Sequence, residues 1–215
     1  MRALALVCTV VAGGAAIWLG AAPPLAADEA APYRLRGSLD AVEGDRLTIA
    51  TREGETRDVA LQDETRIVVV KPARLEDIKK GDYVGLTSID SGGRRIAISA
   101  HIFAEDMRGT AEGHHPWDLV EEPNTMTNAT VAEVQEIGEE RELELTYGQA
   151  EGEAKTEGSQ TIFVPEELAV VRMEKTADRS VLKPGERAFL VVRDAEAGSA
   201  ALAVIVGSEG AAPPM

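Results

Sequence analysis

Apolar and polar residues alternate along most of the chain beyond residue 33, in short runs that are separated by glycine-containing turns. In the first half, Leu39, Val42, Leu47 and Ile49 alternate with polar residues on either side of the turn 43–45. Successive side chains of a β-strand point to opposite faces of its sheet. The spacing therefore predicts a β-hairpin with one buried face.

The second half of the chain repeats this pattern. Val134, Ile137, Leu143 and Leu145 have the same spacing around the turn 138–140. Four further segments correspond in the same order: 59–61 with 162–164, 67–70 with 168–171, 75–86 with 180–190, and 96–103 with 200–206. An internal repeat of this kind predicts two copies of one module, each with five or six short strands and one helical turn.

Short alternating strands with almost no helical periodicity indicate an all-β fold. A helical turn between the third and fourth strands of each copy is typical of a partly open Greek-key barrel of the OB type. We therefore predict two tandem OB-like β-barrel modules, at 28–107 and 128–207. An ordered but irregular linker at 108–127 joins them, and a C-terminal tail follows at 208–215.

The N-terminal segment 1–27 has the order of a secretory signal peptide. Arg2 precedes an apolar run over 3–22, a Pro-Pro pair breaks the helix, and the small residues at 25–27 lead into an acidic stretch. This order predicts export to the periplasm, with cleavage after Ala27 and no stable membrane anchor afterwards. An uncleaved membrane anchor is the alternative, because the apolar run is about long enough to span a bilayer.

Composition narrows the chemistry. The only cysteine is Cys8, within the predicted signal peptide, so the mature chain would have neither disulfides nor thiolate metal sites. The formal net charge of −15 argues against binding to nucleic acids, because an acidic surface repels phosphate.

The predicted linker 108–127 concentrates side chains that are rare elsewhere in the chain. His114, His115 and Asp118 lie there, and His101 precedes it at the end of a predicted strand. Imidazole and carboxylate groups together are ligands for first-row transition metals, so His101, His114, His115 and Asp118 are candidate metal ligands. Apart from that metal, the sequence indicates no cofactor.

The same segment has a second interpretation, in which it is an interface between the two modules. Pro116 and Trp117 would then hold the linker in the groove between the barrels, because one indole buries a large apolar area. Arg108, at the start of the segment, would belong to the same interface. We favour this interpretation over the metal site.

The segment 101–131, with the sequence HIFAEDMRGTAEGHHPWDL followed by TMTNATV, resembles a family of uncharacterised exported proteins of proteobacteria built from tandem OB-like repeats. The leading signal peptide, the paired elements at 75–86 and 180–190 and the tail 212–215 add to the resemblance. It implies a periplasmic location and a repeated β-barrel. It implies no activity, substrate or catalytic residue.

No catalytic motif stands out in the sequence. There is no nucleophile elbow of the G-x-S-x-G type, and no glycine-rich phosphate loop follows a strand and opens a helix. The sequence therefore favours a soluble, non-catalytic periplasmic protein that binds an unidentified protein or small ligand. A periplasmic metal-handling protein is the first alternative, and a carboxylate-based hydrolase is the second.

Overall fold

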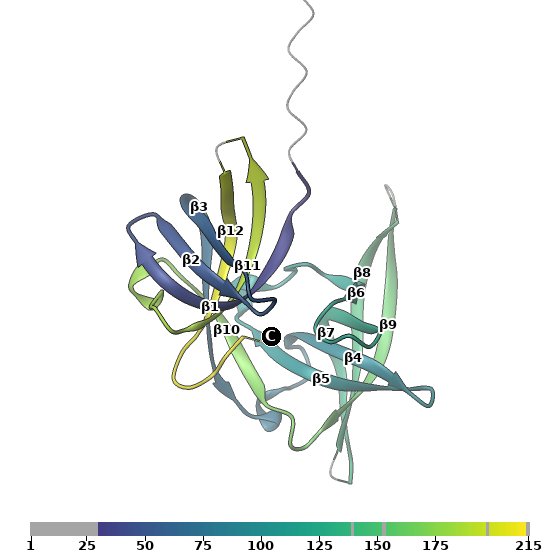
Figure 1. Ribbon diagram of the computed structural model, residues 1–215. Helices are drawn as coiled ribbons and strands as arrows, with labels where there is room; N and C mark the ends of the chain where they lie inside the picture. The colour runs from purple at the N-terminus through teal and green to yellow at the C-terminus, as the bar shows by residue number, and fades with distance from the viewer. Residues whose placement is uncertain (1–29, 139, 152–153, 197, 214–215) are drawn as a thin grey trace, which may run out of the picture.

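The computed structural model describes residues 30–213 except 139, 152–153 and 197. The predicted signal peptide, 1–27, lies outside this range. The described chain is all-β, as predicted, and its strands belong to one continuous sheet that closes into barrels (Figure 1). The strands are β1 (Tyr33–Glu43), β2 (Arg46–Thr51), β3 (Thr56–Ala73), β4 (Tyr83–Ser91), β5 (Arg94–Phe103), β6 (Gly113–Trp117), β7 (Asn124–Ile137), β8 (Glu140–Glu151), β9 (Ala154–Pro165), β10 (Val170–Thr176), β11 (Arg187–Ala195) and β12 (Gly198–Gly207).

The helical content of the described residues is three short 3-10 turns, η1 (Leu75–Asp77), η2 (Glu105–Met107) and η3 (Arg179–Val181). No helix in the described ranges combines the length and the apolar character needed to cross a bilayer.

The first barrel consists of β1, β2, β3, β12 and β11, in that order around its wall. β1 pairs with β2 and β11 in antiparallel fashion, and the parallel pairing of β3 with β12 closes the barrel. Its interior is filled by the side chains that alternation places on the inner face of each strand, together with Leu182 just after η3. The buried members are Leu39, Leu47, Ile49, Val59, Leu61, Ile67, Val69, Leu182, Ala188, Leu190, Val192, Ala201, Val204 and Val206.

The second barrel has the same order of pairing, with β7, β8, β9, β5 and β4 around its wall. It is closed by a short parallel contact between β9 and β5, where Phe163 lies opposite Ile96. Leu75 and Ile78, at and after η1, fill one end of its core. The other buried members are Val84, Leu86, Ala97, Ala100, Ile102, Ala129, Val131, Leu143, Leu145, Tyr147, Ile162, Val164 and Val170.

The two barrels are not the two halves of the chain, which corrects the predicted division at 28–107 and 128–207. The first barrel takes three strands from the first half and two from the second, and the second barrel takes the complementary set. The physical reason is the length of β3, whose 18 residues extend over about 60 Å. This strand carries the chain from the first barrel to the second before η1, β4 and β5 form.

β10 makes the return crossing. It pairs antiparallel with the last residues of β3 and parallel with β5, so it joins the two barrels into one sheet. A third apolar cluster lies where the barrels meet. Its buried members are Val68, Val70, Tyr83, Phe103, Met107, Val171, Met173, Ala203 and Ile205.

The predicted linker 108–127 is more regular than expected. β6 spans Gly113–Trp117 and pairs antiparallel with β7, which already begins at Asn124. The segment is irregular before β6 and between these two strands, and its strand residues, 113–117 and 124–127, belong to the sheet of the second barrel. Of the predicted tail 208–215, the structure describes residues as far as Pro213, and that residue is buried.

Candidate functional site

The side chains considered as metal ligands do not converge. His114 and His115 are consecutive residues of β6, so they point to opposite sides of the strand. His114 Nδ1 lies 2.8 Å from Thr127 Oγ1, and its ring stacks on Tyr147. His115 is exposed, with Nε2 3.3 Å from the main-chain oxygen of Glu112.

The other two candidates are elsewhere. His101 is buried in β5, and Asp118 forms ion pairs with arginines of the first barrel. In the described part of the chain, no three His, Cys, Asp or Glu side chains are placed to hold one metal ion. The four residues are therefore not a common ligand set.

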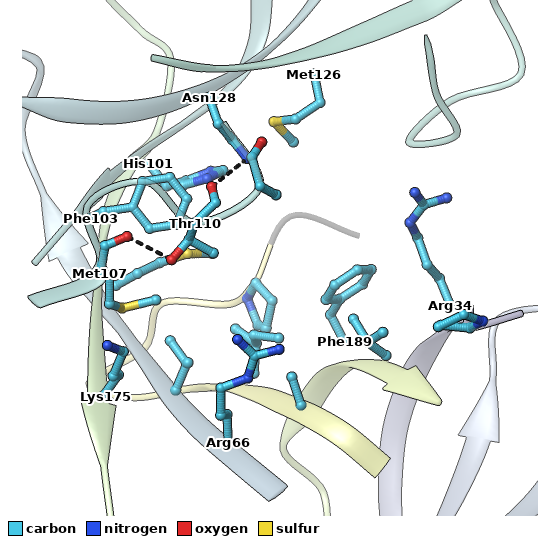
Figure 2. A pocket seen from close by; sticks show the side chains of 18 of the residues that line it. Arg34, Arg66, His101, Phe103, Met107, Thr110, Met126, Asn128, Lys175 and Phe189 are labelled. Carbon is cyan, nitrogen blue, oxygen red and sulfur yellow. Dashed lines mark hydrogen bonds between the residues drawn. The ribbon is translucent and has the colours of Figure 1, made fainter. Parts of the chain in front are cut away.

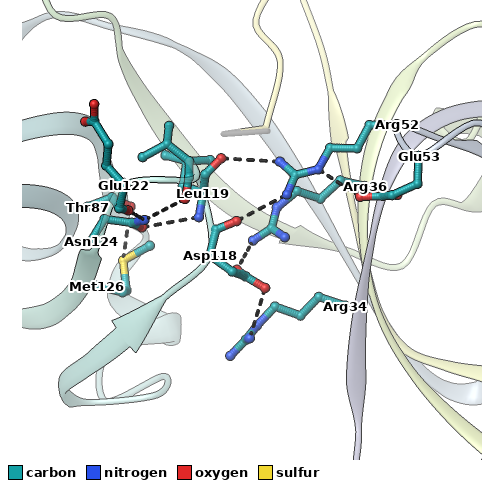
Figure 3. Close-up of polar contacts among 11 residues, drawn as sticks. Arg34, Arg36, Arg52, Glu53, Thr87, Asp118, Leu119, Glu122, Asn124 and Met126 are labelled. Carbon is teal, nitrogen blue, oxygen red and sulfur yellow. Dashed lines mark hydrogen bonds and ion pairs between the residues drawn. The ribbon is translucent and has the colours of Figure 1, made fainter.

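Asp118 instead connects the two barrels (Figure 3). Its Oδ1 accepts a hydrogen bond of 2.6 Å from Nη2 of Arg36, and its Oδ2 lies 3.4 Å from Nη1 of Arg34. Arg52 donates to the main-chain carbonyls of Asp118 and Leu119, at 3.2 and 3.3 Å. Arg34 and Arg36 belong to β1 and Arg52 to the turn directly after β2, so they hold the segment after β6 against the first barrel.

The ion pair of Arg36 is the most enclosed of these contacts, because its side chain is only 4% exposed. Partial burial alone would raise the pKa of Asp118, but the hydrogen bond and charge of Arg36, with the charge of Arg34, lower it. Asp118 is therefore a carboxylate at neutral pH and balances the buried guanidinium.

Trp117 lies between the barrels, where its ring is half-buried. The guanidinium of Arg34 is 4.1 Å from the centroid of its ring, and the Phe189 ring of β11 is 6.3 Å away between centroids. Pro116 is exposed on β6 opposite Thr125.

Arg108 makes its contacts at the second barrel. It donates two hydrogen bonds of 2.7 Å to Glu105 and one of 2.9 Å to the carbonyl of Gly81. These bonds hold the η2 turn against the start of β4.

Trp117 also belongs to the wall of a cavity of about 590 Å³ between the barrels (Figure 2). Strands of both barrels contribute to the wall, and most of its residues are apolar or aromatic. The lining residues are Pro32, Tyr33, Arg34, Arg66, Val68, His101, Phe103, Met107, Gly109, Thr110, Ala111, Trp117, Met126, Asn128, Met173, Lys175, Phe189, Val191, Ala203, Ile205 and Pro213.

The charged groups of the wall all have the same sign. Arg34, Arg66 and Lys175 line the cavity, and no Asp or Glu is among the described lining residues. This is unusual for a chain with 37 acidic and 22 basic residues. The charged side chains that line the cavity are therefore all cations, in a protein that is acidic as a whole.

Two of these cations have partners. Lys175 Nζ donates to the main-chain carbonyl of Asp106 and lies 3.5 Å from its carboxylate, and Arg34 faces Asp118 and Trp117. The side chain of Arg66 has no hydrogen bond or ion pair within the described part of the chain. Its guanidinium points into the cavity in Figure 2.

His101 and Asn128 form a polar patch on the inner wall. Burial lowers the pKa of His101 to about 4, so its ring is neutral at pH 7. The ring packs edge-on against Phe103, with 4.7 Å between the two ring centroids. Asn128 Nδ2 donates to the carbonyls of Ala111 and Thr110, at 3.1 and 3.3 Å. His101 Nδ1 and Asn128 Oδ1 are buried without a partner among the described residues.

Gly85 of β4 makes room for this patch. A Cβ atom on Gly85 would lie 2.0 Å from His101 Nε2 and 2.6 Å from Asn128 Oδ1, well inside van der Waals contact. The absence of a side chain at Gly85 therefore allows both polar side chains to pack over β4 at the cavity wall.

Sequence reasoning identified His101 and Trp117 but not the cavity that they line. Its other members, such as Arg66, Lys175 and Phe189, lie on strands whose local pattern is ordinary. One signal was available: the three methionines between residues 30 and 213, Met107, Met126 and Met173, all line the cavity. Methionine is common at surfaces that adapt to apolar ligands.

Comparisons of this chain with protein-family models, with curated proteins and with solved structures find no match. The resemblance to an exported proteobacterial family therefore stays a prediction.

Proposed function

We propose that this protein is a non-catalytic binding protein that takes a small, largely apolar ligand into the cavity between its two barrels. The observation that carries this proposal is the cavity of about 590 Å³, whose wall is mostly apolar with a few polar groups. Small-molecule sites in proteins have volumes of about 300–1,000 Å³ and the same mixture of lining groups.

The construction of the wall supports a cavity that is formed before the ligand arrives. β3 and β10 cross from one barrel to the other, and hydrogen-bonded strands make up most of the lining. The contacts of Asp118 and Leu119 with the arginines of the first barrel hold the barrels together at one side. A pre-formed site loses less conformational entropy on binding than a flexible one.

Two further parts of the proposal come from the sequence. The pattern of residues 1–27 supports export, and we propose the periplasm as the place of function. The matching segments of the two halves, together with the equal strand order of the two barrels, support the duplication of one module. The metal-handling alternative is not favoured, because its four candidate ligands lie apart.

An uncharged fluorescent probe tests the proposed site. N-phenyl-1-naphthylamine should gain fluorescence with the purified protein and bind at one saturable site. Ala203→Trp places an indole in the cavity, because Ala203 is a small residue of its wall with 9% exposure. We expect this variant to weaken probe binding by about tenfold or more, which corresponds to about 1.4 kcal/mol.

Val120→Trp is the matched control, because Val120 is 43% exposed and outside the cavity wall. It should bind the probe as the parent does. A thermal melt of each protein checks that both variants are folded, and Ile205→Trp, in the same wall, replaces Ala203→Trp if that variant does not fold. Equal probe affinity of folded cavity variants and parent would refute the proposed site.

A further inference from the structure

We infer that the ligand is an amphipathic anion, with an apolar chain enclosed by the cavity and one anionic headgroup paired with Arg66. This inference rests on the proposed function and adds the chemical class of the ligand. Its basis is the juxtaposition of apolar walls, three cationic side chains and no carboxylate in one cavity.

Charge complementarity points to an anion. The excess of acidic residues makes the chain as a whole repel anions, yet the described lining residues include no acid. A cationic or neutral apolar ligand would form no ion pair with the cationic side chains that line the cavity. An anion in the cavity would be the counterion of Arg66, for which the described protein offers none.

The position of Arg66 suits a headgroup at one side of the cavity. Arg66 and Val68 lie two residues apart on β3 and so face the same way, and Lys175 of β10 is paired with Val68. Arg66 also lies opposite Ala203 of β12 in the wall. Arg66 and Lys175 therefore form one positive edge, on adjacent strands (Figure 2).

Arginine is well suited to this role. Its guanidinium presents a planar set of N–H donors that matches the two oxygens of a carboxylate or two of a phosphate. Because no group among the described residues holds its side chain, Arg66 can adjust to a headgroup without breaking an ion pair within that part of the protein. Lys175 adds positive charge nearby while Asp106 holds its amine.

The rest of the cavity suits an uncharged chain. Phe103, Met173, Ala203 and Ile205 provide apolar surface from the three strands β5, β10 and β12. His101 faces Arg66 and Lys175 from the other side of the cavity in Figure 2, and burial keeps its ring neutral at pH 7. The wall at His101 therefore adds no charge to the cavity, and the apolar chain of the ligand would lie on this side.

Four single-chain compounds, used below their micelle concentrations, test the charge preference by displacing N-phenyl-1-naphthylamine. Dodecanoate should compete about tenfold or more strongly than dodecanol, because a charge-assisted hydrogen bond contributes about 1.5–3 kcal/mol. Dodecyltrimethylammonium should compete no better than the alcohol. Dodecyl phosphate compared with dodecanoate shows which headgroup the site prefers, and a preference for either one supports the inference.

Three variants test Arg66. Arg66→Glu should weaken dodecanoate binding about tenfold or more and leave dodecanol unchanged, whereas Arg66→Lys should lose less affinity, because the charge is retained although the planar set of donors is lost. Arg187→Glu has the same change of charge on an exposed residue of β11 outside the cavity, and should bind dodecanoate as the parent does. Probe binding by all three variants confirms that the cavity is intact.

The outcomes separate the two proposals. If the probe binds but dodecanoate competes no better than dodecanol, or if Arg66→Glu and Arg187→Glu have equal effects, the anion inference is wrong and the cavity proposal stands. If neither the probe nor any of the four compounds binds, the proposed function itself fails.

Discussion

Removal of residues 178–215 should unfold the first barrel and leave the second barrel folded. The deleted segment includes η3, β11 and β12, which supply two of the five strands of the first barrel and its buried residues Leu182 and Leu190. Without them, β1 and β3 become open sheet edges and the apolar faces of three strands meet water. Every strand of the second barrel is retained, and so is β10.

Amide hydrogen exchange on the truncated protein measures this result residue by residue. Protection should fall to the level of an unfolded chain at Leu39, Leu47 and Ile49, and should persist at Leu143 and Leu145. If each half of the chain were a module by itself, the truncation would have the opposite effect. Residues 33–106 would then stay protected and the second half would open.

Gly37→Ala should destabilise the protein by about 3 kcal/mol or more, because the added methyl group would overlap the backbone of β2. Its Cβ would lie 1.9 Å from the carbonyl oxygen of Ala50 and 2.9 Å from the Cα of Thr51. β1 is fixed at this position by pairing with β2 on one side and β11 on the other. The clash is therefore relieved only by breaking part of the first barrel. Urea denaturation gives the free energy of unfolding.

Gly148→Ala is the matched control for this prediction. Gly148 also lies in a strand, β8, but the nearest atom to its added Cβ would be Glu112 Oε2 at 3.8 Å, which is ordinary contact. We expect a change within about 1 kcal/mol, because alanine loses less backbone entropy than glycine on folding. Equal stability losses in the two variants would contradict the close approach of β1 and β2 at Gly37.

The strands and their buried faces could be predicted from the sequence because they depend on local alternation. Leu39, Leu47 and Ile49 were expected on one inner face, and all three are fully buried. The matching hairpin of β7 and β8 buries Leu143 and Leu145 in the same way. Ile137 is an exception with 46% exposure, because it lies beside the turn of the hairpin, paired with Glu140.

The partners of the strands could not be predicted in this way. The alternation of apolar and polar residues shows which side chains of a strand share a face, but it does not show which other strand pairs with it to close a barrel. The segments 59–61 and 67–70 were identified as two parts of the repeat within one module, yet they belong to the single strand β3, which continues into the second barrel. Its continuation into the second barrel is a property of the packed protein, so the exchange of strands between the halves has no local signal.

The candidate site likewise combines features that the local sequence indicates with features that depend on the pairing of distant strands. Composition alone drew attention to Trp117 and Asp118, and both residues contact the first barrel. The cavity depends on residues more than 100 positions apart, such as Arg66 and Lys175, which come together only because β3 and β10 pair. An exposed arginine within a strand gives no sequence signal of a binding role.

The three cavity methionines give the most direct test that a ligand occupies the space between the barrels. We propose to label the methionine methyl groups with carbon-13 and to titrate the protein with dodecanoate, following the signals of Met107, Met126 and Met173. All three signals should shift with one common saturation curve, and Ala203→Trp should suppress the shifts. Binding of dodecanoate with no change in these three signals would place the ligand elsewhere and contradict the proposed site.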